Sequence, residues 1–431
     1  MRFRIVRATN VVLGLLCLMY LLTYVDRLNF STVVLDRQFL KEIPLDKVQI
    51  GFVFSAFAYP YLIFQVIGGW VADRFGPRRA LTVCGFIWAG VTVVTGLVHG
   101  LVGLFLARVV VGFGEGATFP AATRAMSYWT PKEKRGFAQG ITHAFSRLGN
   151  TLTPFLVAWL TLATSWRGSF IMVGCISLLW VVAWMIYFRD DPGRHPAVTR
   201  EEIAHLPPYG SKSSLGVKIP WRQLLPRMAP VTFVYFCYGW ILWLYLSWIP
   251  SFFMGNFNLD LKKSALFSSG VFVSGVVGDT LGGIVSDFLF NKTGNAKLAR
   301  CTMVAVMMTL CGLSLAPILF TRDMTIVALA LSTGFFFAEM TIGPMWAIPM
   351  DIAPRYSGTA SGLMNTGSAL AAILSPVIGG YLIQVSGNWL LPFMVSAGVI
   401  LLGAIFSFTM HPERPLAEVP VEDAVPAVIH G

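Results

Sequence analysis

Twelve long runs of apolar residues constrain the fold of this chain more than any other feature of its sequence. By hydropathy, these runs cover about residues 10–33, 49–72, 80–98, 101–128, 136–160, 167–188, 228–253, 264–289, 298–320, 324–349, 358–384 and 388–410. A helix that crosses the hydrocarbon core of a bilayer needs about 20 predominantly apolar residues. Only 12% of the 431 residues are charged, whereas soluble domains carry about 25% charged residues. The sequence therefore predicts an all-α membrane protein with twelve transmembrane helices.

One long polar stretch, residues 189–227, separates the first six runs from the last six. It is rich in proline and charged residues, and it predicts a cytoplasmic linker with a short surface helix near Arg200–His205. We therefore expect one six-helix bundle over residues 1–188 and a second over residues 228–410. The tail, residues 411–431, is rich in proline and acidic residues, and we expect it to be disordered.

The two halves repeat a set of glycine, proline and acidic positions. The matching blocks are offset by 222, 214 and 224 residues: Gly136, Gly140 and Pro154 match Gly358, Gly362 and Pro376; Gly69 and Asp73 match Gly283 and Asp287; Glu115, Pro120 and Met126 match Glu339, Pro344 and Met350. A duplicated six-helix unit predicts two pseudo-symmetric bundles. In such an architecture the substrate site lies between the bundles near the bilayer midplane, and it opens alternately to the two sides of the membrane.

Basic residues gather in the loops on one side of the predicted membrane domain. The clusters are Arg2, Arg4 and Arg7; Arg74, Arg78 and Arg79; Lys132, Lys134 and Arg135; and Lys292, Lys297 and Arg300. Loops rich in lysine and arginine stay in the cytoplasm, so we expect both termini and the linker there. The net charge of +11 then reflects orientation in a cell membrane, with the lipid bilayer as the partner, rather than binding to nucleic acid.

No sequence feature points to a metal, a cofactor or an enzymatic reaction. The six cysteines all fall within apolar runs and lack the spacing of metal ligands. A G-x-x-x-x-G-K-S/T phosphate-binding loop is absent, which argues against a pump driven by ATP, and no nucleophile–base constellation appears. We expect the proton as the coupling ion and no other cofactor. We also expect a monomer, because one chain contains both halves of the cavity.

Several charged residues fall inside the apolar runs, where a charge is costly and marks a functional candidate. They are Asp26, Arg27, Arg108, Glu115, His143, Arg147, Asp279 and Glu339. Arg108 and Glu115 are two helical turns apart and share a helix face. Arginine binds a carboxylate through two parallel hydrogen bonds, and a buried acid beside an arginine is suited to proton coupling. The competing interpretations are an ion-pair network that only holds helices together and, for Asp26 and Arg27, a position near the far membrane face.

A basic hairpin between the second and third runs carries the first resemblance to a known family. Its pattern G-x-x-x-D-R-x-G-x-R-R is formed by Gly69, Asp73, Arg74, Gly76, Arg78 and Arg79. This pattern resembles the loop between helices 2 and 3 of the major facilitator superfamily. The resemblance implies a gating role, with Asp73 capping a neighbouring helix and meeting basic partners. The repeat copy keeps Gly283 and Asp287 but loses the arginines, so we expect an asymmetric gate dominated by the first half.

Further motifs are similar to those of the anion:cation symporter family within that superfamily. The matching segments are Tyr24-Val25-Asp26-Arg27-Leu28-Asn29, Phe54-Ser55-Ala56-Phe57-Ala58, Gly112-Phe113-Gly114-Glu115 and Gly358–Gly367. That family includes bacterial galactonate, glucarate, hexuronate and phthalate transporters and sialin-type carriers. The resemblance implies that Asp26 and Glu115 are the protonation sites and that Arg27 and Arg108 bind the substrate carboxylate. It also implies that the pocket is lined by Tyr24, Tyr61, Trp346 and Asn365, although ordinary packing remains open for Trp346 and a helix contact for Asn365.

The fifth run departs from the sugar-acid members by carrying His143 and Arg147. These two cationic candidates indicate a more anionic ligand, such as a diacid or a phosphorylated compound. Alternatively, Arg147 pairs with Glu115 or Glu339 and never touches substrate, and His143 only packs. Glu339, the repeat partner of Glu115, is either a further proton site or a structural hydrogen-bond partner of the eleventh helix.

Together these features predict a secondary transporter that imports an organic anion, a sugar acid or another carboxylate, with protons. An organophosphate exchanger is the alternative favoured by the surplus arginines. A proton-driven efflux antiporter is the alternative favoured by the segment from Gly149 to Pro154, which is loosely similar to the antiporter motif of the fifth helix.

Overall fold

The computed structural model describes residues 7–34, 36–45, 47–209, 219–259 and 261–416, and every regular element in this part of the chain is helical. The first bundle contains α1 (Ala8–Val33), α3 (Lys47–Phe75), α4 (Pro77–Thr95), α5 (Leu101–Gly116), α6 (Thr118–Trp129), α7 (Arg135–Ala163) and α8 (Trp166–Tyr187), with the short α2 (Arg37–Glu42) in its first loop. The second contains α10 (Trp221–Phe257), α11 (Leu261–Thr293), α12 (Met303–Ser314), α13 (Met324–Glu339), α14 (Ile342–Ile352), α15 (Ser357–Ser386) and α16 (Leu391–Phe406). A π-helical turn, η4 (Lys297–Thr302), leads into α12, and short 3-10 turns are η1 (Lys132–Lys134), η2 (Pro192–Arg194), η5 (Ala316–Leu319), η6 (Pro354–Tyr356) and η7 (Ser407–Thr409).

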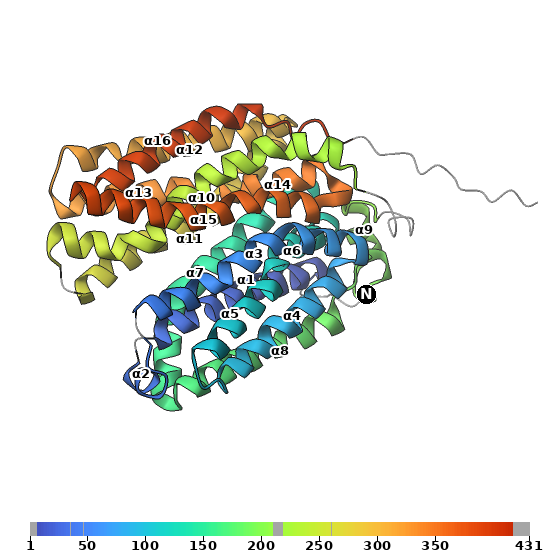
Figure 1. The fold of residues 1–431 in the computed structure, drawn as a ribbon. Helices are drawn as coiled ribbons and strands as arrows, with labels where there is room; N and C mark the ends of the chain where they lie inside the picture. Colours follow the sequence, from blue (N-terminus) through green and yellow to red (C-terminus); the bar gives the residue numbers. More distant parts are fainter. Residues whose placement is uncertain (1–6, 35, 46, 210–218, 260, 417–431) are drawn as a thin grey trace, which may run out of the picture.

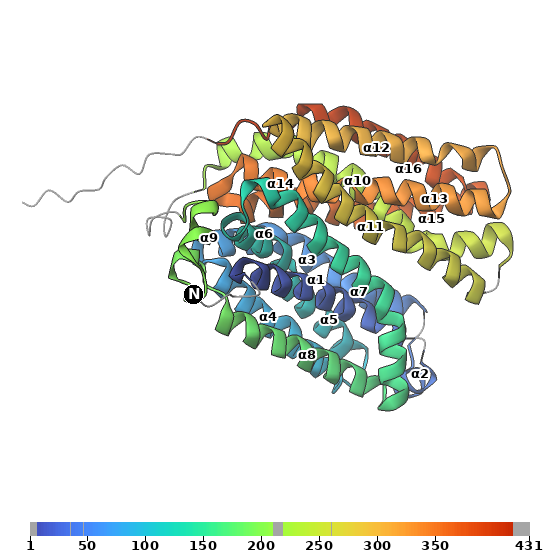
Figure 2. The same cartoon turned by 180° about the vertical axis from the view of Figure 1, so that it is seen from behind.

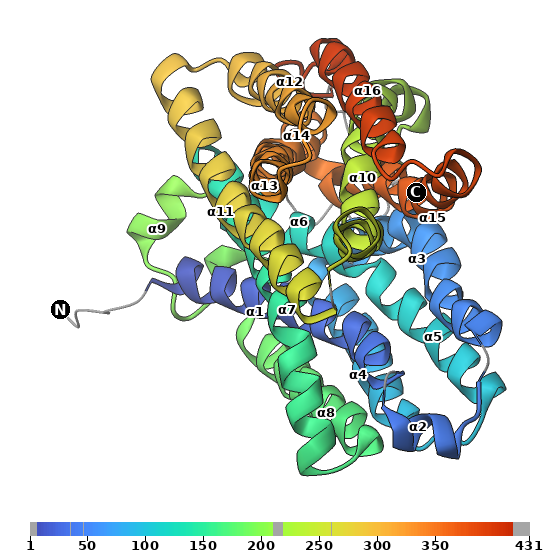
Figure 3. The same ribbon diagram turned by 90° about the vertical axis from the view of Figure 1, so that its left-hand side faces the viewer.

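The two bundles lie side by side as separate colour blocks in Figure 1. They meet along two helix pairs, α7 with α11 and α3 with α15, which Figure 3 shows from the end of the molecule that carries α2. Their ribbons approach most closely at the end that carries α9 and the start of α1, and they diverge toward the end that carries α2 (Figures 1 and 2).

Two predicted spans are each broken into two helices, at repeat-related places. The fourth span breaks at Ala117 between α5 and α6, and the tenth breaks between α13 and α14. Pro120 and Pro344 each follow the break at the third position of the new helix, and proline has no N–H to continue the hydrogen bonds of the preceding turn. Each break follows a candidate acid, Glu115 or Glu339, so the two acids occupy equivalent helix ends.

Ten segments of the described chain are long and apolar enough to cross a membrane. The other two predicted spans are α4, which begins with Pro77 followed by two arginines, and α7, whose buried face carries polar side chains such as Gln139 and Arg147. Helix α4 packs against α8 inside the first bundle, and α7 packs against α1 on one side and against α11 of the second bundle on the other. The order of twelve membrane-length segments is therefore the predicted one.

The connections differ from the sequence predictions in two places. Helix α10 begins at Trp221, inside the stretch predicted as linker up to residue 227. Residues 411–416, predicted as part of a disordered tail, are in contact with the second bundle, since the N–H of Leu416 donates to the carbonyl of Ile352 at 2.8 Å. Residues 417–431 lie outside the described part. The predicted short helix is present as α9 (Arg200–His205), with a capping box between Thr199 and Glu202.

Candidate functional site between the two bundles

A buried ion pair between α1 and α5 forms the centre of the first bundle's charged cluster. The Nε of Arg27 contacts a carboxylate oxygen of Glu115, whose side chain is fully buried. Four aromatic rings surround the guanidinium, with centroids 4.6 to 5.2 Å from its central carbon: Tyr61, Tyr24, Phe57 and Phe119. Cation–π contacts of this kind stabilise a desolvated guanidinium, so the rings hold the pair in place and exclude water from it.

The neighbouring residues Asp26 and Arg108 complete this cluster without joining the ion pair. The Nη2 of Arg108 donates to the backbone carbonyl of Arg27 at 3.0 Å, and its guanidinium lies 5.0 Å from the Phe30 ring centre. Asp26 points into its own bundle, where Ser177 of α8 donates to it at 3.0 Å. Among the described residues Asp26 has no ion-pair partner. The side chains of Asp26 and Arg108 are both buried inside the protein.

Arg147 of α7 reaches from the first bundle into a cluster of second-bundle groups. Its guanidinium donates to Glu339 at 3.1 and 3.2 Å and to the hydroxyl of Tyr238 at 3.0 Å, and Tyr238 donates to the same Glu339 oxygen at 2.9 Å. Asp279 of α11 lies 3.7 Å from Arg147. Of the two pairings left open for Arg147, the structure has the one with Glu339.

An aromatic layer joins the two clusters. The ring of His143 lies 4.9 Å from that of Trp346 and 5.9 Å from that of Phe119, and its Nε2 has no hydrogen-bond partner among the described residues. The indole N–H of Trp346 donates to the hydroxyl of Tyr235 at 2.7 Å. The ring of Tyr24 lies between the two arginines, 5.0 Å from the guanidinium of Arg27 and 6.0 Å from that of Arg147.

Asn365 joins the two bundles at the contact between α3 and α15. Its amide donates to the side-chain oxygen of Gln65 at 2.9 Å and to the hydroxyl of Tyr61 at 3.4 Å. The helix-contact interpretation of Asn365 therefore describes its position here. Because Tyr61 also packs on Arg27, this contact connects the second bundle to the ion pair of the first.

Two acids close the α9 end of the molecule in a pseudo-symmetric way. Asp73 at the end of α3 accepts hydrogen bonds from the backbone N–H groups of Gly358 (3.0 Å) and Thr359 (2.6 Å) at the start of α15. Asp287 near the end of α11 accepts from those of Gly136 (2.9 Å) and Phe137 (2.6 Å) at the start of α7. A carboxylate at a helix N-terminus satisfies free N–H groups and complements the helix dipole. Each bundle therefore caps a helix of the other.

Glycine residues permit this close contact. A side chain at Gly69 would collide with the backbone of Gly358, and one at Gly283 would collide with the backbone of Gly136. The predicted gating positions Gly69, Asp73 and Asp287 thus all lie at the contact between the bundles.

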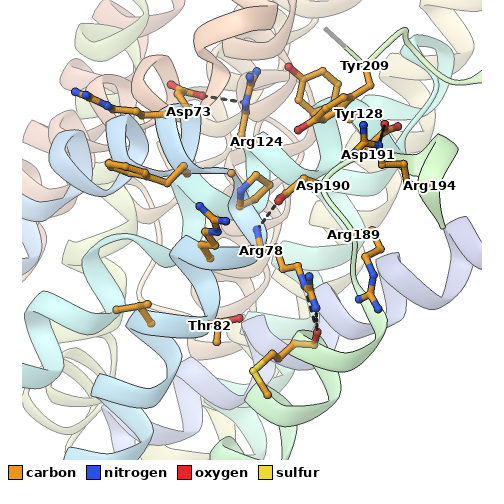
Figure 4. Close-up of a pocket in the computed structure, with 18 residues that line it drawn as sticks. Asp73, Arg78, Thr82, Arg124, Tyr128, Arg189, Asp190, Asp191, Arg194 and Tyr209 are labelled. Atoms are coloured by element: carbon orange, nitrogen blue, oxygen red, sulfur yellow. Dashed lines mark hydrogen bonds and ion pairs between the residues drawn. The ribbon is translucent and has the colours of Figure 1, made fainter. Parts of the chain in front are cut away.

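The arginines of the basic hairpin do not lie at this contact, which differs from the sequence prediction. Arg74 packs on the rings of Trp70 and Phe75, and the guanidinium of Arg78 donates to the carbonyl of Met185 at 2.7 Å. With Arg79 they line a cavity of about 960 Å³ between the first bundle and the stretch that follows α8, shown in Figure 4. Gly76 adopts a φ of 86°, which favours glycine.

Asp190, in the loop that follows α8, also lines this cavity. Its carboxylate accepts a hydrogen bond from the backbone N–H of Arg78 at 2.8 Å. Burial raises the pKa of Asp190 above its ordinary value in spite of this bond.

The cation that pairs with Asp73 is instead Arg124 of α6, at 3.2 Å (Figure 4). Asp287 has its own cation, Arg300 of η4, at 3.0 Å. Each half thus supplies one acid and one cation at this contact, and in the second half a residue outside the hairpin copy supplies the charge that the copy lost. Arg135 of α7 adds a further bond between the bundles, donating to Asp351 at 2.8 Å.

Several of these partners are not among the residues that the sequence motifs predict. They are Arg124, Asp351, Tyr238 and Gln65, while Arg135 and Arg300 were counted only as cytoplasmic loop charges. Arg124 and Gln65 carry a usable signal, because a charge and an amide inside predicted spanning runs are costly without a partner. Tyr238 carries none, since tyrosine is common in spanning helices.

Comparison with known proteins shows that this chain is similar to membrane transporters. Residues 16–376 match the model of the Major Facilitator Superfamily. The chain is 45% identical over 410 residues to the probable sulfoacetate transporter SauU of Cupriavidus necator, covering 94% of this chain and 95% of that protein. It is 28% identical over 427 residues to the probable galactarate/D-glucarate transporter GudP of Escherichia coli, covering 93% of each chain. Among solved structures, FucP, a superfamily transporter in the outward conformation, has a TM-score of 0.70 at 14% identity, covering 94% of this chain and 100% of that one. The predicted fold of twelve helices in two bundles is thereby confirmed.

Proposed function

Because this chain belongs to the major facilitator superfamily, within the anion:cation symporter type, and is a multi-pass membrane transporter, we propose that it imports a small organic dianion of the sulfoacetate class together with protons. The relative that is 45% identical along almost its whole length is named a probable sulfoacetate transporter. Sulfoacetate carries one sulfonate and one carboxylate, which fits the expectation of a ligand more anionic than a sugar monoacid. Sugar diacids such as galactarate, named for a relative at 28% identity, are the second substrate class.

The observation that carries the proposal is a buried guanidinium nitrogen and a buried imidazole nitrogen, both without a hydrogen-bond partner in the described chain, beside one aromatic ring. Nη2 of Arg27 and Nε2 of His143 have no hydrogen-bond partner within the part of the chain that the structure describes. Both groups lie against Phe119, at 5.2 Å for the guanidinium and 5.9 Å for the imidazole ring. A buried donor left without an acceptor costs about 1–3 kcal/mol. Anionic oxygens placed beside Phe119 remove this cost at Nη2 of Arg27, and also at Nε2 of His143 in the tautomer that carries its proton there.

Glu115 competes with the substrate for Arg27, and this competition couples the anion to a proton. While Glu115 is ionised, it holds the guanidinium in the ion pair. When Glu115 takes up a proton, the attraction weakens and Arg27 becomes available to a substrate anion. Binding of a proton and binding of the anion therefore favour each other, which is the linkage that a symporter requires.

Asp26 supplies a second proton site in this scheme. It is 3% exposed, and its one hydrogen bond in the described chain comes from a neutral hydroxyl. An ionised carboxylate without a direct ion-pair partner is costly in an apolar interior, so in this scheme Asp26 carries its proton in this conformation. Protons on Glu115 and Asp26 together balance the two charges of the dianion.

The positive-inside rule and the position of the closed end support the proposed orientation, and the inward proton gradient then favours import. The loops rich in lysine and arginine lie at the α9 end, which we assign to the cytoplasm together with both termini. The bonds of Asp73 and Asp287 close that end, so the present conformation faces outward from the cell membrane. Opening of these bonds after loading releases the anion and its protons inside. One chain contains both bundles, and we propose that it works as a monomer.

Uptake into proteoliposomes tests this function. We expect purified protein to accumulate radiolabelled sulfoacetate under an inward proton gradient, ahead of galactarate, glucarate, hexuronates, tartrate and phthalate. In Glu115→Gln, Arg27 lacks a competing charge at every pH and one proposed proton site is lost, so the variant should still exchange substrate across the membrane but should lose most of its gradient-driven accumulation. Glu201→Gln on the exposed face of α9 is the matched control and should behave as the wild type.

Three results would contradict the proposal. Proton symport would be excluded if the uptake rate did not depend on the proton gradient, or if none of the acids were taken up. Counterflow of inorganic phosphate would identify the organophosphate exchanger instead. The exchanger alternative depends on arginines that have no acidic partner and could bind phosphate. Arg147 is not such a residue, because it pairs with Glu339 and Asp279.

A further inference from the structure

Asp279 of α11, Glu339 of α13 and Arg147 of α7 form a buried triad that spans the contact between the bundles. We propose that this triad is an additional proton-binding site, in which the two carboxyl groups share one proton while the bundles are in contact. This inference rests on the proposed proton-coupled transport and extends it, because it adds a site that responds to the movement of the bundles rather than to substrate.

The charge balance of the triad requires a proton. It contains two acids and one guanidinium, the acids have no exposed surface, and Arg147 is 3% exposed. With both acids ionised, one negative charge remains without a cation in an apolar interior, which is strongly unfavourable. One proton bound to the pair leaves one carboxylate for one guanidinium. The triad is then neutral.

Unsatisfied atoms indicate where this proton is held. Both side-chain oxygens of Asp279 and Oε1 of Glu339 have no hydrogen-bond partner among the described residues. Oε2 of Glu339 accepts from Arg147 and Tyr238 at 2.9 to 3.2 Å, whereas Asp279 lies 3.7 Å from Arg147 without a hydrogen bond. Glu339 is therefore the ionised partner of Arg147, and the hydroxyl of a protonated Asp279 has an acceptor in the free Oε1 of Glu339.

Glycines on both bundles bring the three side chains together. A side chain at Gly140 of α7 would collide with the backbone carbonyl of Asp279, and one at Gly278 of α11 would come within 3.2 Å of the Cβ of Glu339. These close approaches fix the acids relative to each other inside the second bundle. Arg147 alone comes from the first bundle, so a movement between the bundles changes its distance to both acids at once.

The other titratable groups that surround the triad are a histidine, three tyrosines and a cysteine. They are His143 on α7, Tyr24 on α1, Tyr235 and Tyr238 on α10, and Cys311 on α12. None of them supplies a second positive charge to the acids while His143 is neutral. The balance of one cation against two acids therefore holds for the surroundings that the structure describes.

Opening of the α9 end releases this proton. Arg147 lies 12 residues after Arg135, about 18 Å along α7 from the closed end, so water enters beside the triad when α7 and α11 separate. Water lowers the cost of a second ionised carboxylate, and the proton passes from Asp279 to water on that side. The triad thus holds a proton in the closed state and loses it in the open state.

The proton-to-anion ratio tests the proposal directly. The ratio is obtained in proteoliposomes from the membrane potential at which net flux of labelled sulfoacetate vanishes at a fixed pH gradient. Asp279→Asn leaves Glu339 and Arg147 as a neutral pair without a bound proton. We expect this variant to transport with one proton fewer per anion than the wild type, while the control Glu201→Gln keeps the wild-type ratio. An unchanged ratio in an active Asp279→Asn would overturn the triad as a proton site.

Thermal stability in detergent gives a second measurement that does not need transport. In the wild type, loss of the shared proton leaves an unpaired buried carboxylate, so the triad should lower Tm as pH rises. Asp279→Asn has no such proton, and its Tm should fall less steeply between pH 5 and 9. Equal slopes in the two proteins would contradict the proposal. If the wild type transports no anion with protons, the proposed function is wrong. The difference in the pH dependence of Tm between the wild type and Asp279→Asn still tests whether the triad binds a proton.

Discussion

Replacing Arg27 by lysine is expected to lower gradient-driven anion uptake by about 100-fold. The guanidinium of Arg27 contacts Glu115 through Nε and leaves Nη2 free, inside a ring of four aromatic side chains. Lysine keeps the charge, but a single ammonium group cannot hold an acid and an anion in the same planar arrangement. Loss of about two charge-assisted hydrogen bonds corresponds to about 3 kcal/mol, which is about 100-fold in binding. Initial uptake rates over a range of substrate concentrations measure the effect.

The matched comparison separates substrate binding from general damage. Arg222→Lys lies at the exposed start of α10 and should transport normally. Arg27→Ala leaves Glu115 buried without a cation, which costs about 3–5 kcal/mol, so that variant should also unfold at a lower temperature. Arg27→Lys with wild-type uptake would mean that Arg27 only stabilises the first bundle.

Sequence patterns were sufficient for the fold because a bilayer leaves few choices. The apolar runs predicted the order of the helices, and the repeat of Glu115 in Glu339 predicted that the two acids occupy equivalent places. The breaks after these acids were not predicted, although Pro120 and Pro344 cause both of them. Hydropathy measures how apolar a segment is, and it does not report where the hydrogen bonds of a helix stop.

The partners of the charged residues could not be predicted in the same way. Arg27 and Asp26 are adjacent in the sequence, yet one faces the ion pair and the other faces α8. Arg74 was favoured as a gate cation from its motif, whereas Arg124, fifty residues later, is the residue that pairs with Asp73. Such pairings depend on how helices from distant parts of the chain cross, and one sequence contains no direct measure of those crossings.

Introducing a leucine at Gly69 is expected to hold the α9 end open and to lower transport by at least about 100-fold. A side chain at this position collides with the backbone of Gly358 and Thr359, which cannot rotate away as a side chain would. Helix α3 must then move away from α15, and Asp73 loses its three hydrogen bonds to Gly358 and Thr359. Three bonds to a charged group contribute roughly 5 kcal/mol together. A change of about 5.5 kcal/mol inverts a population from 99:1 to 1:99, so the closed state becomes the minor one.

Cysteine labelling detects this opening without relying on transport. Ser357, at the start of α15, has no exposed surface in the closed state. In a Cys175→Ala background, which removes the exposed native cysteine, Ser357→Cys should react slowly with a maleimide in the wild type and at least about tenfold faster together with Gly69→Leu. Gly90→Leu is the matched control, because nothing lies within 4 Å of a side chain at Gly90. The repeat-related Gly283→Leu should act in the same direction by separating α11 from α7. If Ser357→Cys stays protected in both glycine variants, the contact at the α9 end is a rigid part of the fold, and the bundles must open around a different contact.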